Sequence, residues 1–217
     1  MPEPKWLILT ALAMEGRAIT QAFGVRLADG AGPTLLPAAG LGRLWVIGPR
    51  AARLSDEMIA GHSRIILAGL AGALDPALNI GDVIVDSADD GQWANLPFLW
   101  RAIHSSDHLV ATAAEKRRLF EQTGAAAVDM ESAIVRRRAA AVGAAVLSIR
   151  AIGDRAEESL PPDLVDWIDP MGRARAGSVA AGIARRPWGI GRALRLARHS
   201  RCACKALGMA VRRVISA

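Results

Sequence analysis

The chain has 217 residues, 52% hydrophobic and 22% charged, which excludes a disordered protein and suits one α/β domain with a sizeable core. Its net charge of +6 is uneven, because residues 1–170 hold 16 basic against 21 acidic residues, whereas residues 171–217 hold 11 basic and none that is acidic. No secretory leader or bilayer-spanning run is recognisable. The two cysteines, Cys202 and Cys204, predict no metal site or disulfide framework. We therefore expect a cytoplasmic protein.

Short apolar runs and helical patterns alternate along the first 150 residues. In chain order, the predicted strands are 6–10, 44–47, 64–68, 125–129 and 145–150, and the predicted helices are 17–23, 51–60, 113–122 and 133–142. The segment 30–42 is rich in turn residues and predicts a loop or hairpin. This alternation is typical of a sheet covered by helices.

The segment Val128–Ala133 combines a strand end with a helix start. Small apolar residues lead into Asp129, Glu131 follows two residues later, and a helical pattern begins near Ser132. Open α/β sheets bind ligands at the carboxyl ends of their strands, so these carboxylates are well placed to bind sugar hydroxyls. The alternative is that Asp129 and Glu131 only cap the helix.

Val128–Ala133 also resembles the signature of the purine nucleoside phosphorylase and methylthioadenosine nucleosidase superfamily. The segments 68–74 with 78–85, and Arg150–Asp154, resemble two further motifs of that superfamily in the same order. The resemblance covers residues 5–155 and implies a single-domain three-layer α/β fold, a central mixed sheet flanked by helices. It implies a catalytic domain at residues 1–170, followed by a basic helical tail at residues 171–217.

The resemblance implies an enzyme that cleaves an N-ribosidic bond. In relatives, an Asp at the position of Asp154 donates a proton to purine N7, and such a general acid contributes about 10²–10⁴-fold. In the nucleosidase branch, a Glu four residues after a strand-end Ala activates water, a spacing that Ala11 and Glu15 reproduce. Met130 and Glu131 match the pair that binds the ribose.

Further pocket residues follow from the same resemblance. The base-pocket candidates are Leu109, Val110 and Gly72, and the phosphate-binding candidates are Arg17, Arg43, Arg50 and Gly69. Glu15 favours water as the nucleophile and the arginines favour inorganic phosphate as co-substrate, so both stay open; no other cofactor is implied. Leu70 replaces the family's Ser or Cys, and the segment 86–108 is shorter than in relatives, which leaves an impaired catalyst open.

The tail predicts an amphipathic basic helix from residue 192 onward. Its apolar residues recur on one side and its basic residues on the other: Leu196, Leu207, Val211 and Val214 against Arg195, Arg198, Arg201, Lys205 and Arg212. Such a helix can lie on a membrane surface, or it can pack on its own domain. Nucleic acid is not expected as a partner, because no aromatic interleaving accompanies the charge.

One branch, the hopanoid-associated phosphorylases, resembles the chain around Lys116, Thr123–Ala125, Leu160–Pro162 and in the tail. This resemblance implies adenosylhopane as substrate, with release of adenine and a ribosyl or phosphoribosyl hopane. The basic tail fits a peripheral membrane location, and a homo-oligomer is expected because relatives in the superfamily form dimers, trimers or hexamers. Two alternatives remain: a methylthioadenosine/S-adenosylhomocysteine-type nucleosidase, and a non-catalytic nucleoside-binding module that docks on membranes.

Overall fold

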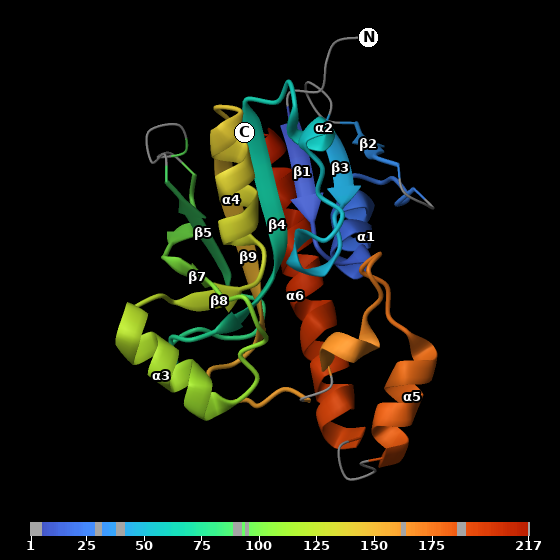
Figure 1. Ribbon diagram of the computed structural model, residues 1–217, viewed down its shortest axis with the longest axis vertical. Coiled ribbons are helices and arrows are strands. Elements are labelled where there is room, and N and C mark those ends of the chain that lie inside the picture. Colours follow the sequence, from blue (N-terminus) through green and yellow to red (C-terminus); the bar gives the residue numbers. More distant parts are fainter. Residues whose placement is uncertain are drawn as a thin grey trace.

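The computed structural model describes residues 6–28, 32–37, 42–88, 93, 96–161, 164–185 and 190–216, and its centre is a mixed β-sheet with helices on both faces (Figure 1). The strands are β1 Trp6–Thr10, β2 Thr34–Leu36, β3 Gly42–Val46, β4 Arg64–Ala73, β5 Val83–Ser87, β6 Leu99–Trp100, β7 Ile103–Ser105, β8 Ala127–Asp129 and β9 Ala145–Asp154. The helices are α1 Ala13–Ala22, η1 Pro49–Ala51, α2 Asp56–Ile59, α3 Ala113–Thr123, α4 Ser132–Ala141, η2 Leu164–Trp167, α5 Ala176–Arg185 and α6 Ile190–Ser216. The predicted fold class, a three-layer α/β domain with a C-terminal helix, is confirmed.

The sheet has the strand order β2-β3-β1-β4-β9-β5-β6, and β8 joins it by pairing with both β4 and β7. The β1–β3, β1–β4, β4–β9, β5–β6 and β7–β8 pairs are parallel, whereas β2–β3, β4–β8 and β5–β9 are antiparallel. The long strands β4 and β9 run side by side at the centre, with a register shift between Ala71 and Gly72. Their carboxyl ends therefore project together beyond the shorter strand β1.

Alternate residues of the central strands pack against different helices. Leu7 and Leu9 of β1 contribute to one core cluster with Val135 of α4, whereas Ile8 contributes to another with Ile19 of α1 and Leu207 of α6. Because both faces of the sheet are covered, these strands consist mostly of apolar residues, with exceptions such as Thr10 and Arg150, which explains why they were recognisable as apolar runs.

Helix α6 has two parts with different environments. Its second part, from Ala203 to Ile215, carries eight buried residues and packs against α1 and the sheet. Its first part extends past the sheet, at the lower end of Figure 1, and includes the exposed side chains of Ile190 and Leu194. The second part of α6 is thus a core element of the domain.

Several segments differ from the sequence-based expectation. The helix predicted from residue 17 begins at Ala13, and the strand predicted to end at residue 68 extends to Ala73. Residues 51–60 were predicted as one helix but form only η1 and α2, because Arg50 and Ala51 adopt left-handed φ angles of 55° and 53°. The predicted strand 145–150 extends to Asp154, since its last residues pair with β4 and β5. Part of the predicted loop 30–42 lies outside the described residues, and the rest includes β2, which pairs with β3.

Candidate functional site

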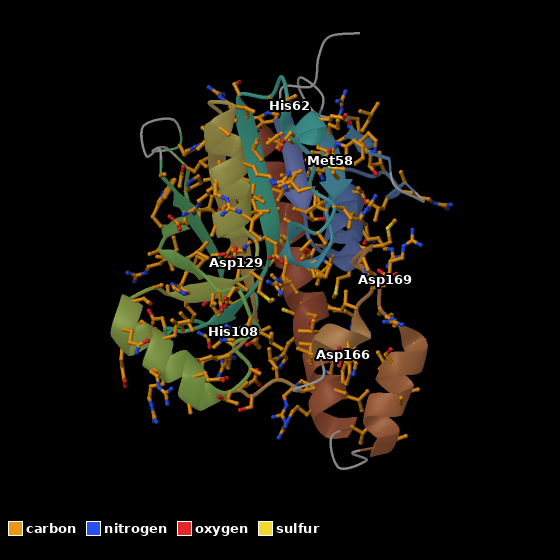
Figure 2. The ribbon with its side chains drawn as sticks, in the orientation of Figure 1. Met58, His62, His108, Asp129, Asp166 and Asp169 are labelled. Atoms are coloured by element: carbon orange, nitrogen blue, oxygen red, sulfur yellow. The ribbon has the colours of Figure 1, made fainter. Side chains whose placement is uncertain are left out.

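A cavity of about 260 Å³ lies where β1, β4, β8 and β9 end. Four carboxylates line it, one from the first turn of α1 and three from the ends of β8 and β9 or just beyond: Glu15, Asp129, Glu131 and Asp154. All four are at most 8% exposed. Figure 2 labels Asp129 and His108, two cavity residues near this end of the sheet, while Met58 and His62 lie at the opposite end.

The Glu15 carboxylate joins α1 to the central strand β4. Its Oε2 accepts a hydrogen bond of 2.8 Å from the backbone N–H of Leu12, and its Oε1 accepts one of 2.8 Å from that of Leu70. Burial raises the pKa of Glu15 to about 7; the two N–H groups and the charge of Arg150 oppose this rise, and the charge of Glu131 adds to it. Glu15 thus caps its helix and also faces the cavity as a carboxyl group able to exchange a proton near neutral pH.

The Glu131 carboxylate is held by the loop between β3 and α2. Its Oε1 accepts a hydrogen bond of 2.9 Å from the backbone N–H of Arg50, one of the two residues with left-handed φ. Burial raises the pKa of Glu131, the charge of Arg150 opposes this rise, and the charge of Asp129 adds to it. The strained loop conformation therefore serves to direct a backbone donor at a cavity carboxylate.

A buried arginine lies behind these carboxylates. Arg150 Nε and Nη2 both bind Asp129 Oδ2, at 2.8 and 2.5 Å, and the Ser132 hydroxyl donates to the same oxygen. A Cβ atom at position 69 would lie 2.6 Å from Arg150 Nη1, so Gly69 makes room for the guanidinium group. Asp129 also accepts a hydrogen bond from the backbone N–H of Ser132, which makes it a partner of Arg150 and of the α4 start.

The Asp154 carboxyl group, at the end of β9, pairs with a fully buried lysine. Lys116 of α3 donates from Nζ to Asp154 Oδ2, and the lysine side chain is 0% exposed. Burial raises the pKa of Asp154, and the charge of Lys116 opposes that rise. A Cβ atom at position 72 would lie 3.0 Å from Asp154 Oδ2, so Gly72 provides the space for this carboxyl group.

The remaining cavity wall is largely apolar. Of the residues suggested by the sequence, Leu109, Val110 and Met130 lie in this wall. A further apolar group comes from α1, from the segment after β9, from η2 and from α6: Leu12, Met14, Leu160, Leu164, Val165, Ile168 and Leu196. This second group was not predicted, because its members are distributed over four segments of the chain with no common motif.

The structure brings together most, but not all, of the predicted site residues. Arg50 lines the cavity, whereas Arg17 and Arg43 do not: Arg17 is exposed on α1, and Arg43 lies on β3. Gly69 lies behind the cavity wall, beside Arg150 and Glu15. Lys116 and Arg150 were missed as site residues. Arg150 could have been found, because an arginine within an otherwise apolar strand is a signal of a buried charge, whereas Lys116 stands in a run of charged residues on α3 and gives no such signal. Within the described part of the chain, no cluster of His, Cys, Asp and Glu is arranged to hold a metal ion.

The comparison with protein families gives one match. Residues 94–185 match the phosphorylase superfamily. The matched segment contains Lys116, Asp129, Glu131, Arg150 and Asp154, so it supplies most of the charged groups around the cavity. Curated protein sequences give no match to the chain.

Solved structures share the fold over almost the whole chain. The 5′-methylthioadenosine/S-adenosylhomocysteine nucleosidase of Helicobacter pylori gives a TM-score of 0.67 at 16% identity and covers 99% of both chains. A putative nucleosidase of the same type from Francisella philomiragia gives the same TM-score, identity and coverage. Futalosine hydrolase of Helicobacter pylori gives 0.59 at 18% identity, covering 96% of this chain and 95% of the other. At these identities, the likeness is one of fold.

Proposed function

We propose that this protein hydrolyses the N-ribosidic bond of an adenosine-bearing substrate. The observation that carries the proposal is that Glu15 and Asp154, two buried carboxyl groups whose pKa values are raised by burial, face one cavity. A raised pKa brings a carboxyl group closer to the range in which general acid–base catalysis operates, and the pKa of Glu15 is about 7. The match to the phosphorylase superfamily and the fold shared with nucleosidases support the same reaction class.

The proposed reaction assigns one proton transfer to each carboxyl group. Asp154 in its protonated form donates to purine N7, so that the base leaves as neutral adenine when the C1′–N9 bond breaks. Glu15 in its ionised form takes a proton from the water that bonds to C1′. The products are adenine and a ribosyl compound. Asp154 has lost one proton and Glu15 has gained one, so transfer of a proton from Glu15 to Asp154, directly or through solvent, restores the starting enzyme.

Glu131 is assigned to the ribose. Its ionised carboxylate accepts hydrogen bonds from the 2′- and 3′-hydroxyls, and these strengthen as the sugar becomes cationic in the transition state. Met130 follows Asp129 in the chain and lines the cavity. It is assigned to pack against the sugar. Asp129 does not share this role in the proposal, because Arg150 and Ser132 already bind its Oδ2.

Water is favoured over phosphate as the nucleophile. The cavity is lined by four carboxylates, whereas Arg50 is the arginine that reaches it and Arg150 lies behind it, paired with Asp129. A phosphate dianion beside Glu15 and Glu131 would be repelled, unless unpaired cations compensated. Of the predicted phosphate-binding set, Arg17 and Arg43 do not line the cavity.

The finer proposal is that the substrate carries a bulky apolar group, as adenosylhopane does. The apolar wall from Leu160, Leu164, Val165, Ile168 and Leu196 extends the cavity toward α6. Val165 of this wall is 47% exposed, and Ile190 and Leu194 of α6 are also exposed, at 50% and 61%. The exposed arginines of α6, at positions 192, 195, 198 and 201, complete a surface suited to an anionic membrane. Among the described residues, no helix is long and apolar enough to cross a membrane.

The second candidate is a nucleosidase for small thioadenosines. The same apolar wall fits a methylthio group, and two of the similar structures are named as 5′-methylthioadenosine/S-adenosylhomocysteine nucleosidases. The two candidates differ in the size of the apolar group at C5′, and not in the bond that is cleaved.

Adenine release from a series of adenosines with C5′ substituents of increasing apolar size tests both candidates. The lipid proposal expects kcat/KM to rise along the series, whereas the small-substrate candidate expects a maximum at methylthioadenosine. Hydrolysis expects equal rates with and without inorganic phosphate, and phosphate dependence would overturn it. No adenine release from any member would overturn the proposed reaction itself.

A further inference from the structure

The Lys116 side chain is the buried cation that the proposed reaction has so far not used. It lies on α3, a helix that begins with a hydrogen bond from the backbone N–H of Glu115 to the Thr112 hydroxyl, and its side chain is 0% exposed. A fully buried lysine is costly unless every donor is satisfied and its charge is compensated. A free-energy cost of this kind is expected where the buried lysine has a function in the site that it contacts.

The contacts of Lys116 account for all of its donors. Its Nζ donates to Asp154 Oδ2, to the carbonyl of Arg155 at 2.6 Å and to the carbonyl of Glu158 at 2.9 Å. Three acceptors require the three hydrogens of an ammonium group, whereas a neutral amine offers two. The lysine is therefore held in its charged form, and it binds one particular oxygen of the Asp154 carboxyl group.

The two oxygens of Asp154 are thereby made different. Oδ2 is occupied by Lys116, while within the described residues no donor binds Oδ1. Asp154 lines the nucleoside cavity and Lys116 does not, so the lysine approaches the carboxyl group from behind. An oxygen that accepts from an ammonium group does not carry the acidic proton, which leaves that proton to Oδ1.

We propose that Lys116 is a positioning residue for proton donation: its ammonium group holds Oδ2 of Asp154, so that Oδ1 carries the proton delivered to the purine. The inference rests on the proposed function. When Oδ1 loses its proton to N7, the carboxylate that forms is already paired with a cation, and no reorganisation is needed. Lys116 thus fixes which oxygen donates and stabilises the charge that remains.

The inference predicts a specific change in pH dependence. Burial is the largest influence on the pKa of Asp154 and raises it, Lys116 on α3 lowers it, Glu158 in the following loop raises it and His199 on α6 lowers it. The charge of Lys116 lowers the pKa of Asp154, so removing that charge lets burial raise this pKa further. The alkaline limb of kcat, where the acid loses its proton, must then move to higher pH. A lysine that only supported the fold would leave that limb in place.

The test compares two leaving groups in four variants. Adenine requires protonation to leave, whereas 4-nitrophenolate leaves as an anion, so a 4-nitrophenyl riboside reports on the rest of the site. Lys116→Gln is expected to lower adenine release by about 10²-fold, with little change for the nitrophenyl riboside and with the alkaline limb at higher pH. Lys116→Arg, which keeps the cation, is expected to recover part of the loss.

Asp154→Asn and Arg117→Met serve as controls. Asp154→Asn must lose adenine release and keep the nitrophenyl reaction, and failure of that result, or an inactive wild-type enzyme, counts against the proposed function. Arg117 is the exposed neighbour of Lys116 on α3, and its replacement must change neither reaction. Equal losses for both leaving groups in Lys116→Gln, an unmoved alkaline limb, or a variant that circular dichroism shows to be unfolded would each assign Lys116 to the scaffold and overturn the inference.

Discussion

Arg150 and Asp129 form a buried ion pair behind the cavity, with both Nε and Nη2 of the arginine on a single carboxylate oxygen. Their side chains are 2% and 1% exposed. The pair joins β9 to the end of β8 and, through Ser132, to the start of α4. Removing one partner of such a pair leaves the other charge buried without compensation.

We therefore expect Asp129→Ala to lower the free energy of unfolding by about 3–5 kcal/mol. The matched control is Asp56→Ala, which breaks the Arg138–Asp56 pair, whose side chains are 40% and 84% exposed. Exposed pairs of this kind contribute at most about 1 kcal/mol. Urea denaturation measures both values, and equal losses in the two variants would contradict the buried-pair interpretation.

The activity is expected to depend on ionisation of Glu15. Burial raises its pKa to about 7, and only the ionised form accepts a proton from water. The rate of adenine release, as kcat/KM, should therefore rise with pH through about pH 7, before the alkaline limb where Asp154 loses its proton. Glu15→Gln should lower it by about 10²–10⁴-fold. A profile of the wild-type enzyme that is flat between pH 5 and about pH 8 would contradict this assignment.

The same carboxyl group is expected to reduce stability above neutral pH. Because the pKa of Glu15 is raised from 4.5 to about 7, folding favours its protonated form. The stabilising contribution is present below the unfolded value of 4.5 and is lost as pH rises through about 7. When the pH rises from 4 to 8, the wild type should therefore lose about 3 kcal/mol of unfolding free energy relative to Glu15→Gln, whose side chain does not ionise. A pH-independent difference in unfolding free energy would contradict the raised pKa.

Glu131→Gln is expected to weaken binding of the ribosyl group in the transition state. Loss of a charge-assisted hydrogen bond to a sugar hydroxyl costs about 1.5–3 kcal/mol, a decrease in kcat/KM of roughly 10–100-fold. Glu121→Gln, on the exposed side of α3, is the matched control with no expected change. Steady-state adenine release measures both, and wild-type kcat/KM for Glu131→Gln would remove this residue from the site.

The exposed arginines of α6 are expected to bind anionic membranes. Replacing Arg192, Arg195, Arg198 and Arg201 with Gln should abolish co-sedimentation with phosphatidylserine vesicles at low salt, since each cation contributes about 1 kcal/mol near such a surface. The melting temperature should change little, because these side chains are exposed. Deleting α6 is not a suitable test, because Ala203–Ile215 belong to the core. Wild-type protein that ignores anionic vesicles would exclude the membrane proposal.

The sequence alone determined the features that depend on short-range pattern. Strand β1 was predicted with its observed bounds, and α4 begins at Ser132 as predicted, because apolar runs and a carboxylate before a helix are local signals. The amphipathic face of α6 was also evident, since Leu207, Val211 and Val214 recur with the helical period and are buried. The order of the motifs, together with β-strand ends, placed Glu15, Glu131 and Asp154 at one edge of the sheet.

Only the tertiary structure decided which charged groups meet. Lys116 reaches Asp154 across 38 positions, Glu15 reaches the backbone of Leu70 across 55, and Glu131 reaches that of Arg50 across 81. It also separated Arg50, which lines the cavity, from Arg17 and Arg43, which do not. The period of a helix or strand fixes which side of an element is buried, but the partner that a buried charge finds depends on how elements distant in the sequence pack together. For this reason, the roles of Glu15 and Asp154 could be suggested from the sequence, but the groups that shift their pKa values could be identified only from the folded chain.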